Sequence, residues 1–161
     1  MVSAQAAYHS REIAAAERHA RQSIAVDPNF WAGHLNLAQA LAAQGRFEDA
    51  LAAASEAFRL AGNSKGLTHQ AYMLGRMGRG AEALELLRAF QEAGSVVPPY
   101  EIALIHAGIG KADAVFEWLE KAYAVRDVHL VFLPVDPKMD AFRGDPRFQA
   151  LLDRCGFMQR R

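Results

Sequence analysis

The feature that most constrains the fold of this chain is a repeat of about 33 residues. Gly45, Gly78 and Gly110 follow one another at intervals of 33 and 32 residues. The same two intervals separate the members of two further sets: Ala38, Ala71, Ala103 and Leu41, Leu74, His106. Two longer sets begin with an additional interval of 34 residues: Ala16, Ala50, Ala83, Val115 and Ala20, Ala54, Leu87, Leu119. A repeat of this size is one supersecondary unit that buries its apolar face against its neighbours, so we expect similar units stacked in chain order.

Within one repeat the pattern predicts two helices joined by a turn at glycine. Leu37, Ala38 and Leu41 recur at spacings of three and four residues, which place them on one helical face. Gly45 follows where a left-handed residue commonly ends a helix. No segment alternates apolar and polar residues over a sustained stretch, which argues against strands. The sequence therefore predicts an all-α chain, with helices at 2–9, 11–26, 30–44, 47–61, 65–77, 80–93, 98–109 and 112–125, and short helices at 128–134, 137–143 and 145–155.

These residues resemble the tetratricopeptide repeat (TPR) family. The best match lies in residues 31–64, through His34-x2-Leu37-Ala38-x2-Leu41, then Gly45, Phe47, Ala50, Ala54 and Ala57. The resemblance implies a right-handed α-α superhelix, or solenoid, of TPR helix hairpins with a C-terminal helical cap. It divides the single domain 1–161 into a partial repeat at 1–30, repeats at 31–64, 64–96 and 97–127, and capping helices at 128–161.

The two ends of the chain differ from the repeats between them. The first unit lacks the beginning of its first helix, so we expect either a fragment of a longer protein or a protein with a shortened first helix. At the other end, Asp136-Pro137 and Asp145-Pro146 are helix starts, because Asp caps a helix and Pro fits its first turn. Apolar residues near these starts are expected to cover the last helix pair: Phe132, Leu133, Met139, Phe142, Phe148, Leu151 and Leu152.

The ending also has a resemblance of its own. Residues 97–123 and the tail 135–152 are similar to the closing segment of TPR regions in bacterial multidomain signalling or transcriptional regulators. In those proteins such a region follows a class III nucleotide cyclase, a protein kinase or a winged-helix DNA-binding domain. The resemblance implies a larger bacterial regulator as the parent architecture and transfers no activity to these residues.

Composition and charge exclude several classes of partner. Lys+Arg at 18 balance Asp+Glu at 18, for a formal net charge of +0, so the chain lacks the positive field that attracts nucleic acid or anionic lipid. The longest strongly apolar stretch, residues 128–135, is far shorter than the roughly 20 residues of a membrane span. The N-terminus has no basic region followed by an apolar one, so it does not resemble a signal peptide. We therefore expect a cytoplasmic protein with no nucleic-acid and no membrane partner.

Reactive side chains form no recognisable catalytic or metal-binding motif. The six histidines lack HxxxH spacing and Cys-His clustering, so the sequence predicts no metal site. The run from Gly75 to Gly80 neither follows a strand nor ends in Gly-Lys-Ser/Thr, so helix-turn glycines explain it better than a phosphate loop. Cys155 has no base or electropositive setting that would argue for a catalytic thiol. We predict no catalytic residue and no cofactor.

The TPR resemblance does imply a binding surface, because the first helices of TPR hairpins line a concave face. Mapped onto this chain, the partner-binding groove comprises Asn36, Gln39, Lys65, His69, Tyr72, Arg76, Tyr100 and Glu101. Amide and basic groups suit a peptide backbone or a carboxylate, and tyrosines offer rigid apolar area with a hydroxyl. The TPR subtype that binds the carboxylates of chaperone tails has lysine at the positions that correspond to Leu35, Thr68 and Tyr100. We therefore do not expect this chain to belong to that subtype.

Three classes of function follow from these observations. The leading hypothesis is a non-catalytic protein-protein interaction scaffold, whose groove binds a peptide or partner domain of unidentified sequence. The alternative is a self-association or spacer module of a multidomain signalling protein such as a nucleotide cyclase, which would form a homo-oligomer. An enzyme is the least favoured class, because no nucleophile, base and acceptor stand at plausible spacing.

Overall fold

The structure is a computed structural model that describes residues 3–157 and is all-α over them, with no strand. The helices are α1 (Ala4–His9), α2 (Ile13–Val26), α3 (Trp31–Ala43), α4 (Phe47–Ala61), α5 (Ser64–Arg76), α6 (Gly80–Glu92), α7 (Pro99–Ile109), α8 (Ala112–Ala124) and α9 (Pro146–Arg154), with 3-10 helices η1 (Val128–Phe132) and η2 (Pro137–Phe142). The helices predicted from the sequence are confirmed to within two residues at each described end. Residue 2 of the first expected helix and residues 158–161 of the expected cap lie outside the described residues.

The repeated glycines form the turns inside the hairpins. Gly45, Gly78 and Gly110 have φ angles of 75°, 77° and 82°, which is the left-handed region that side chains with a Cβ rarely adopt. The next helix begins within two residues of each of them. The run Gly75–Gly80 is accordingly the end of α5, the turn and the first residue of α6, as the helix-turn hypothesis requires.

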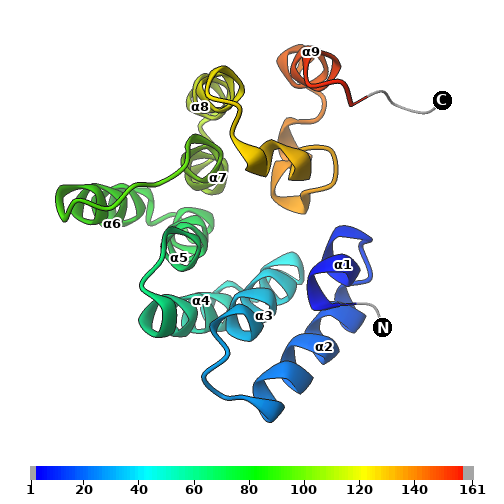
Figure 1. Ribbon diagram of the computed structural model, residues 1–161, viewed down its shortest axis with the longest axis vertical. Helices are drawn as coiled ribbons and strands as arrows, with labels where there is room; N and C mark the ends of the chain where they lie inside the picture. The colour runs from blue at the N-terminus through cyan, green and yellow to red at the C-terminus, as the bar shows by residue number, and fades with distance from the viewer. Residues whose placement is uncertain (1–2, 158–161) are drawn as a thin grey trace.

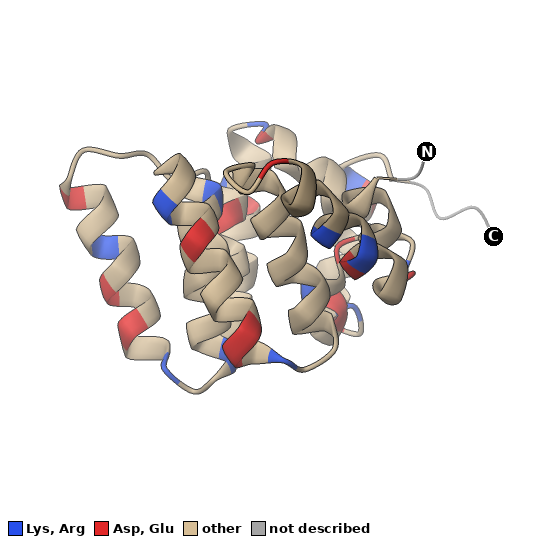
Figure 2. Ribbon diagram, turned by 90° about the horizontal axis from the view of Figure 1, so that it is seen from below, with Lys and Arg blue, Asp and Glu red and all other residues tan. Residues whose placement is uncertain are grey.

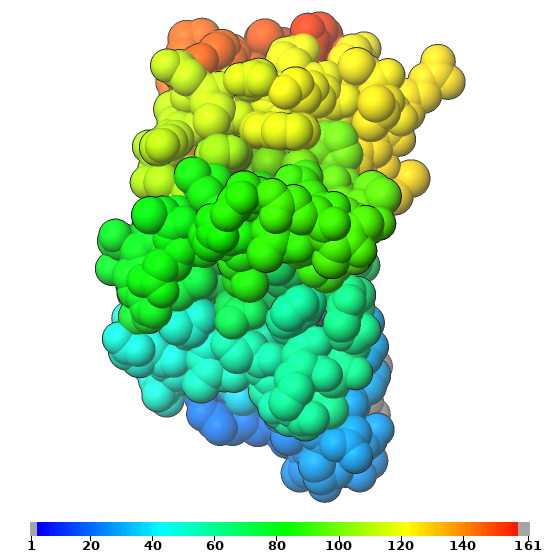
Figure 3. All heavy atoms as spheres, turned by 90° about the vertical axis from the view of Figure 1, so that its left-hand side faces the viewer, coloured from blue at the N-terminus to red at the C-terminus, as the bar shows by residue number. Residues whose placement is uncertain are grey.

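Helices α1 to α8 follow one another along an arc (Figure 1). The odd-numbered helices contact one another in series, α1 with α3, α3 with α5 and α5 with α7. The repeated alanines lie in the core where helices approach: Ala38, Ala71 and Ala103 are completely buried, as are Ala50, Ala54 and Ala83. Figure 3 shows the outer face of the arc as bands that stack in chain order. Each repeat therefore packs mainly on its neighbours in sequence.

The segment 128–142, which contains η1 and η2 and is called the strap below, lies inside the arc between α7 and α1 (Figure 1). Both 3-10 helices contact α7. At its far end Asp140 pairs with Arg11, which follows α1, at 2.6 Å. The predicted starts are confirmed, because the Asp136 and Asp145 side chains accept hydrogen bonds from the backbone N–H of Lys138 and Arg147.

The apolar residues of the C-terminal part pack against two different regions of the chain. Six of the seven expected covering residues are buried, namely Leu133, Met139, Phe142, Phe148, Leu151 and Leu152. Phe142 meets Phe116 of α8 edge to face, with ring centroids 6.4 Å apart. Phe132 differs from the expectation: it is half-buried and stacks on His9 of α1, with centroids 5.3 Å apart and an interplanar angle of 12°. The cap thus reaches the opposite end of the arc as well as the final helix pair.

The charged residues are dispersed over this helical frame. Figure 2 shows acidic and basic positions mixed along the helices. Many of them pair within one helix or across one turn, such as Arg59 with Glu56 at 2.6 Å and Lys121 with Glu117 at 2.7 Å. Within residues 3–157, each helix is too short or too polar to cross a lipid bilayer.

Candidate binding site on the concave face

The eight residues predicted to form the groove all line one of two pockets beside the strap. The basic pocket, of about 450 Å³, is lined by Gln39, Tyr72 and Arg76 together with Arg11, Phe47 and Lys138. The histidine pocket, of about 150 Å³, is lined by Asn36, Gln39, Lys65, His69, Tyr100 and Glu101 together with residues of the strap. The chain therefore gathers the predicted set, although it divides the set between two hollows that share Gln39 and Lys138.

Most residues of the predicted groove are buried, unlike the residues of an open binding surface. Five members are buried: Gln39, His69, Tyr72, Tyr100 and Glu101. Asn36 is half-buried, and only Lys65 and Arg76 are exposed. One cause is the strap, which was expected to cap the end of the arc and instead occupies part of the concave face, where it contacts Tyr100 (Figure 1). Tyr100, only 2 % exposed, uses its hydroxyl to bind the strap rather than solvent or a partner.

A buried ion pair stands at the centre of this arrangement. Lys138 Nζ lies 3.0 Å from Asp136 Oδ1, and the two side chains are 5 % and 4 % exposed. Tyr100 donates its hydroxyl to Asp136 Oδ2 at 3.2 Å, and Lys138 Nζ donates to the Tyr8 hydroxyl at 3.5 Å. Burial by itself raises the pKa of Asp136, but the Lys138 charge and hydrogen bonds outweigh it and leave the pKa lowered. The pair therefore joins α1, α7 and the strap as an ionised unit.

His69 lies beside this pair as a neutral ring. Its Nδ1 is 2.8 Å from the Lys65 carbonyl oxygen, and its Nε2 is 3.0 Å from Gln39 Nε2. These partners assign the proton to Nδ1, which donates to the carbonyl, while Nε2 accepts from the Gln39 amide. Burial, with a further contribution from the Lys138 charge, lowers the pKa of His69 to about 3. The ring therefore stays uncharged across the physiological range.

The depressed pKa of His69 predicts a stability that falls in mild acid. Below pH 6.5 the unfolded chain binds a proton at this position and the folded chain does not, so stability drops as the pH falls toward about 3. Between pH 7 and pH 5 we expect this group to remove about 2 kcal/mol from the free energy of unfolding. Denaturant titrations at several pH values measure this slope. His69→Gln should flatten it, with His19→Gln as the matched change in α2, and equal slopes in wild type and His69→Gln would contradict the assignment.

Two further carboxylates tie α7 to its surroundings. Thr68 donates its hydroxyl to Glu101 Oε2 at 3.2 Å, and burial raises the pKa of Glu101. Asp127 accepts from the Tyr100 backbone N–H at 3.0 Å through Oδ2 and from the His129 backbone N–H at 3.0 Å through Oδ1. These acids therefore serve as helix and turn connectors. Elsewhere, burial raises the pKa of the half-buried Cys155, which disfavours its thiolate.

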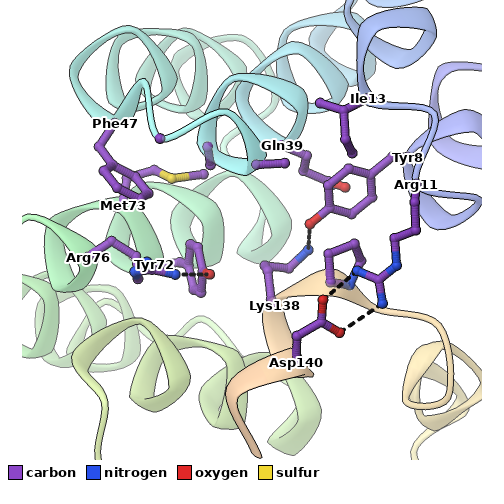
Figure 4. Close-up of a pocket in the computed structure, with 14 residues that line it drawn as sticks. Tyr8, Arg11, Ile13, Gln39, Phe47, Tyr72, Met73, Arg76, Lys138 and Asp140 are labelled. Carbon is purple, nitrogen blue, oxygen red and sulfur yellow. Dashed lines mark hydrogen bonds and ion pairs between the residues drawn. The ribbon is translucent and has the colours of Figure 1, made fainter. Parts of the chain in front are cut away.

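The basic pocket contains residues that the sequence analysis did not single out. Tyr8, Arg11, Lys138 and Asp140 come from the two ends of the chain and meet at the strap (Figure 4). Arg11 donates two hydrogen bonds to Asp140, at 2.6 and 2.8 Å. The only sequence feature near these residues that was interpreted is the helix start at Asp136-Pro137. It predicts a local turn and does not indicate which distant residues the turn contacts.

The site holds no recognisable metal-binding cluster in the described residues 3–157, since no three His, Cys, Asp or Glu side chains are placed to share an ion. No known family model matches the chain, and no curated protein aligns with it.

Proposed function

We propose that this chain is a TPR-type scaffold that binds a peptide or partner domain on its concave face and carries out no catalysis itself. The series of helix hairpins, the left-handed turn glycines and the buried alanines at repeat positions support a TPR superhelix. The resemblance of residues 97–152 to the ends of regulator TPR regions supports a role inside a larger bacterial regulator. Glu101, His69 and Tyr100 are engaged in structural hydrogen bonds, which supports binding rather than chemistry.

The observation that carries this proposal is the strap itself. The arc already binds a short segment of the same chain through the Arg11–Asp140 ion pair, two tyrosine hydroxyls and an aromatic stack. This mixture of contacts is the kind that recognises peptides, with aromatic anchors and paired charges. A partner segment would bind the part of the groove that stays accessible, at Asn36, Lys65 and the mouth of the histidine pocket.

Peptide selection on the whole chain tests the scaffold. Peptides selected from a random displayed library should lose roughly tenfold or more in affinity on the double variant Asn36→Ala/Lys65→Ala. The matched control is Glu56→Ala/Arg59→Ala, an exposed ion pair on α4 outside both pockets. Circular dichroism should show equal helix content in all three proteins. If no peptide is enriched, or if the groove variant binds every selected peptide as tightly as the control does, the proposal fails.

Self-association is a second candidate, favoured by apolar side chains on the outer side of the strap. Val128, Val131 and Val135 are 74 %, 58 % and 41 % exposed. If they form a contact between two copies, sedimentation velocity should show a larger species as the concentration rises, and Val128→Asp/Val131→Asp should abolish it. A single monomeric boundary over a roughly hundredfold range of concentration would exclude this function.

A further inference from the structure

The basic pocket collects hydrogen-bond donors that have no acceptor. Among the described residues, the Tyr72 hydroxyl accepts from Arg76 Nη1 at 3.3 Å and the Tyr8 hydroxyl accepts from Lys138 Nζ at 3.5 Å, yet neither hydroxyl donates its own proton. Figure 4 shows Tyr72 beside the Arg76 guanidinium and Tyr8 beside the Lys138 ammonium. Both tyrosines are buried, at 3 % and 5 % exposure for Tyr8 and Tyr72. Buried donors without acceptors favour a ligand rich in oxygen acceptors.

The charges of this pocket leave one cation without a counterion. Arg11 pairs with Asp140, which also pairs with Arg143, and Lys138 pairs with Asp136. Arg76 has no carboxylate partner in the described part of the chain; its guanidinium contacts only the Tyr72 hydroxyl and the Phe47 ring, 4.9 Å from the ring centroid. A guanidinium that lies over an aromatic ring keeps most of its N–H groups available for a carboxylate. Arg76 is therefore the lining cation that is available to pair with the carboxylate of a ligand.

The rest of the lining is apolar and suits the body of such an anion. Ile13, Phe47 and Met73 supply side-chain carbon, and Met73 is completely buried. On one side Pro137, Lys138 and Asp140 of the strap form the wall, which limits the length of a bound molecule. A volume of about 450 Å³ lies within the range of small-molecule sites, which combine apolar walls with a few placed polar groups.

We propose that the basic pocket binds a small organic monocarboxylate with an apolar or aromatic body. The carboxylate accepts from the Arg76 guanidinium and the Tyr72 hydroxyl, and the body packs against Phe47, Met73 and Ile13. Asn36 and Lys65 line the histidine pocket and not this one, so the site adds a small-molecule ligand to the proposed scaffold and does not depend on the peptide.

The test uses the full chain and three probes whose binding is followed by NMR titration. The probes are 3-phenylpropionate, its neutral amide 3-phenylpropionamide, and the tripeptide acetyl-Gly-Gly-Phe with a free carboxylate. We expect the acid to bind at least roughly tenfold more tightly than the amide, because a charge-assisted pair is lost in the amide. Arg76→Gln should weaken the acid roughly tenfold or more, and Tyr72→Phe about threefold to tenfold. Arg79→Gln, which removes an exposed arginine paired with Glu82, should change nothing.

Four results would overturn the proposal. They are equal affinities for acid and amide, no shift of pocket resonances by millimolar acid, equal weakening by Arg76→Gln and Arg79→Gln, and a tripeptide that binds more tightly than the free acid. Tighter binding of the tripeptide would show that the pocket binds the C-terminal carboxylate of a peptide. Retained binding of selected peptides by Arg76→Gln would leave the scaffold proposal intact, so the two failures are distinguishable.

Discussion

Replacing Gly108 with alanine is expected to destabilise the fold by about 3 kcal/mol, the upper end of overpacking effects. A Cβ at this position would lie 2.6 Å from the Tyr72 carbonyl oxygen and 3.0 Å from the Tyr72 Cα. Both are backbone atoms of α5, so no side-chain rotation relieves the overlap and the two helices must move apart. Helix propensity alone predicts the opposite sign, since alanine is better than glycine by about 1 kcal/mol inside a helix.

Denaturant unfolding followed by circular dichroism measures the effect, and two further variants define its cause. Gly75→Ala should be destabilised to a similar extent, because its Cβ would lie 2.7 Å from the Gly108 carbonyl carbon on the opposing helix. Gly144→Ala is the control, since a Cβ there meets no atom within 4 Å, and we expect a change within about 0.5 kcal/mol. A Gly108→Ala protein as stable as wild type would show that α5 and α7 do not approach this closely.

Replacing Lys138 with methionine is expected to cost about 3–5 kcal/mol, because it leaves a buried carboxylate without its counterion. Asp136 is 3 % exposed, and among the described residues its carboxylate would retain only the Tyr100 hydroxyl and a backbone N–H as hydrogen-bond partners. The control Lys121→Met breaks an exposed pair with Glu117 on α8 and should change stability by less than about 1 kcal/mol. Similar losses in both variants would mean that the strap is not held by its ion pair.

The pH dependence of this loss distinguishes a stranded charge from lost packing. In the wild type the lowered pKa of Asp136 stabilises the fold above the ordinary value of 3.8, and this contribution is lost as the pH falls below it. In Lys138→Met, burial is no longer opposed by the ammonium and raises the pKa, so the variant accepts a proton more readily than the unfolded chain. The difference between the two proteins should therefore shrink toward pH 4. The double variant Asp136→Asn/Lys138→Met should recover part of the loss at neutral pH.

Much of the site could be anticipated from the resemblance to TPR repeats. That resemblance implies that Asn36, Gln39 and His69 lie on the concave face, and the structure places them in one pocket. Their exposure could not be anticipated in the same way. Tyr100 is buried where it binds Asp136 of the strap, and a helical period contains no information about that distant segment. The close approach at Gly108 was missed as well, because this glycine lies inside the predicted helix 98–109 and the helical pattern does not show which helix packs against it.

The helices, their turns and their order follow from local patterns in the sequence. Those features depend on contacts within one repeat, where three- and four-residue spacings, left-handed glycines and Asp-Pro starts act over a few residues. Only the tertiary structure decided where the strap lies. Arg11 and Asp140 are 129 residues apart in the chain and meet because the arc of repeats brings its two ends together. The packing of all the helices together determines whether these two residues come into contact, and no local sequence pattern encodes that contact.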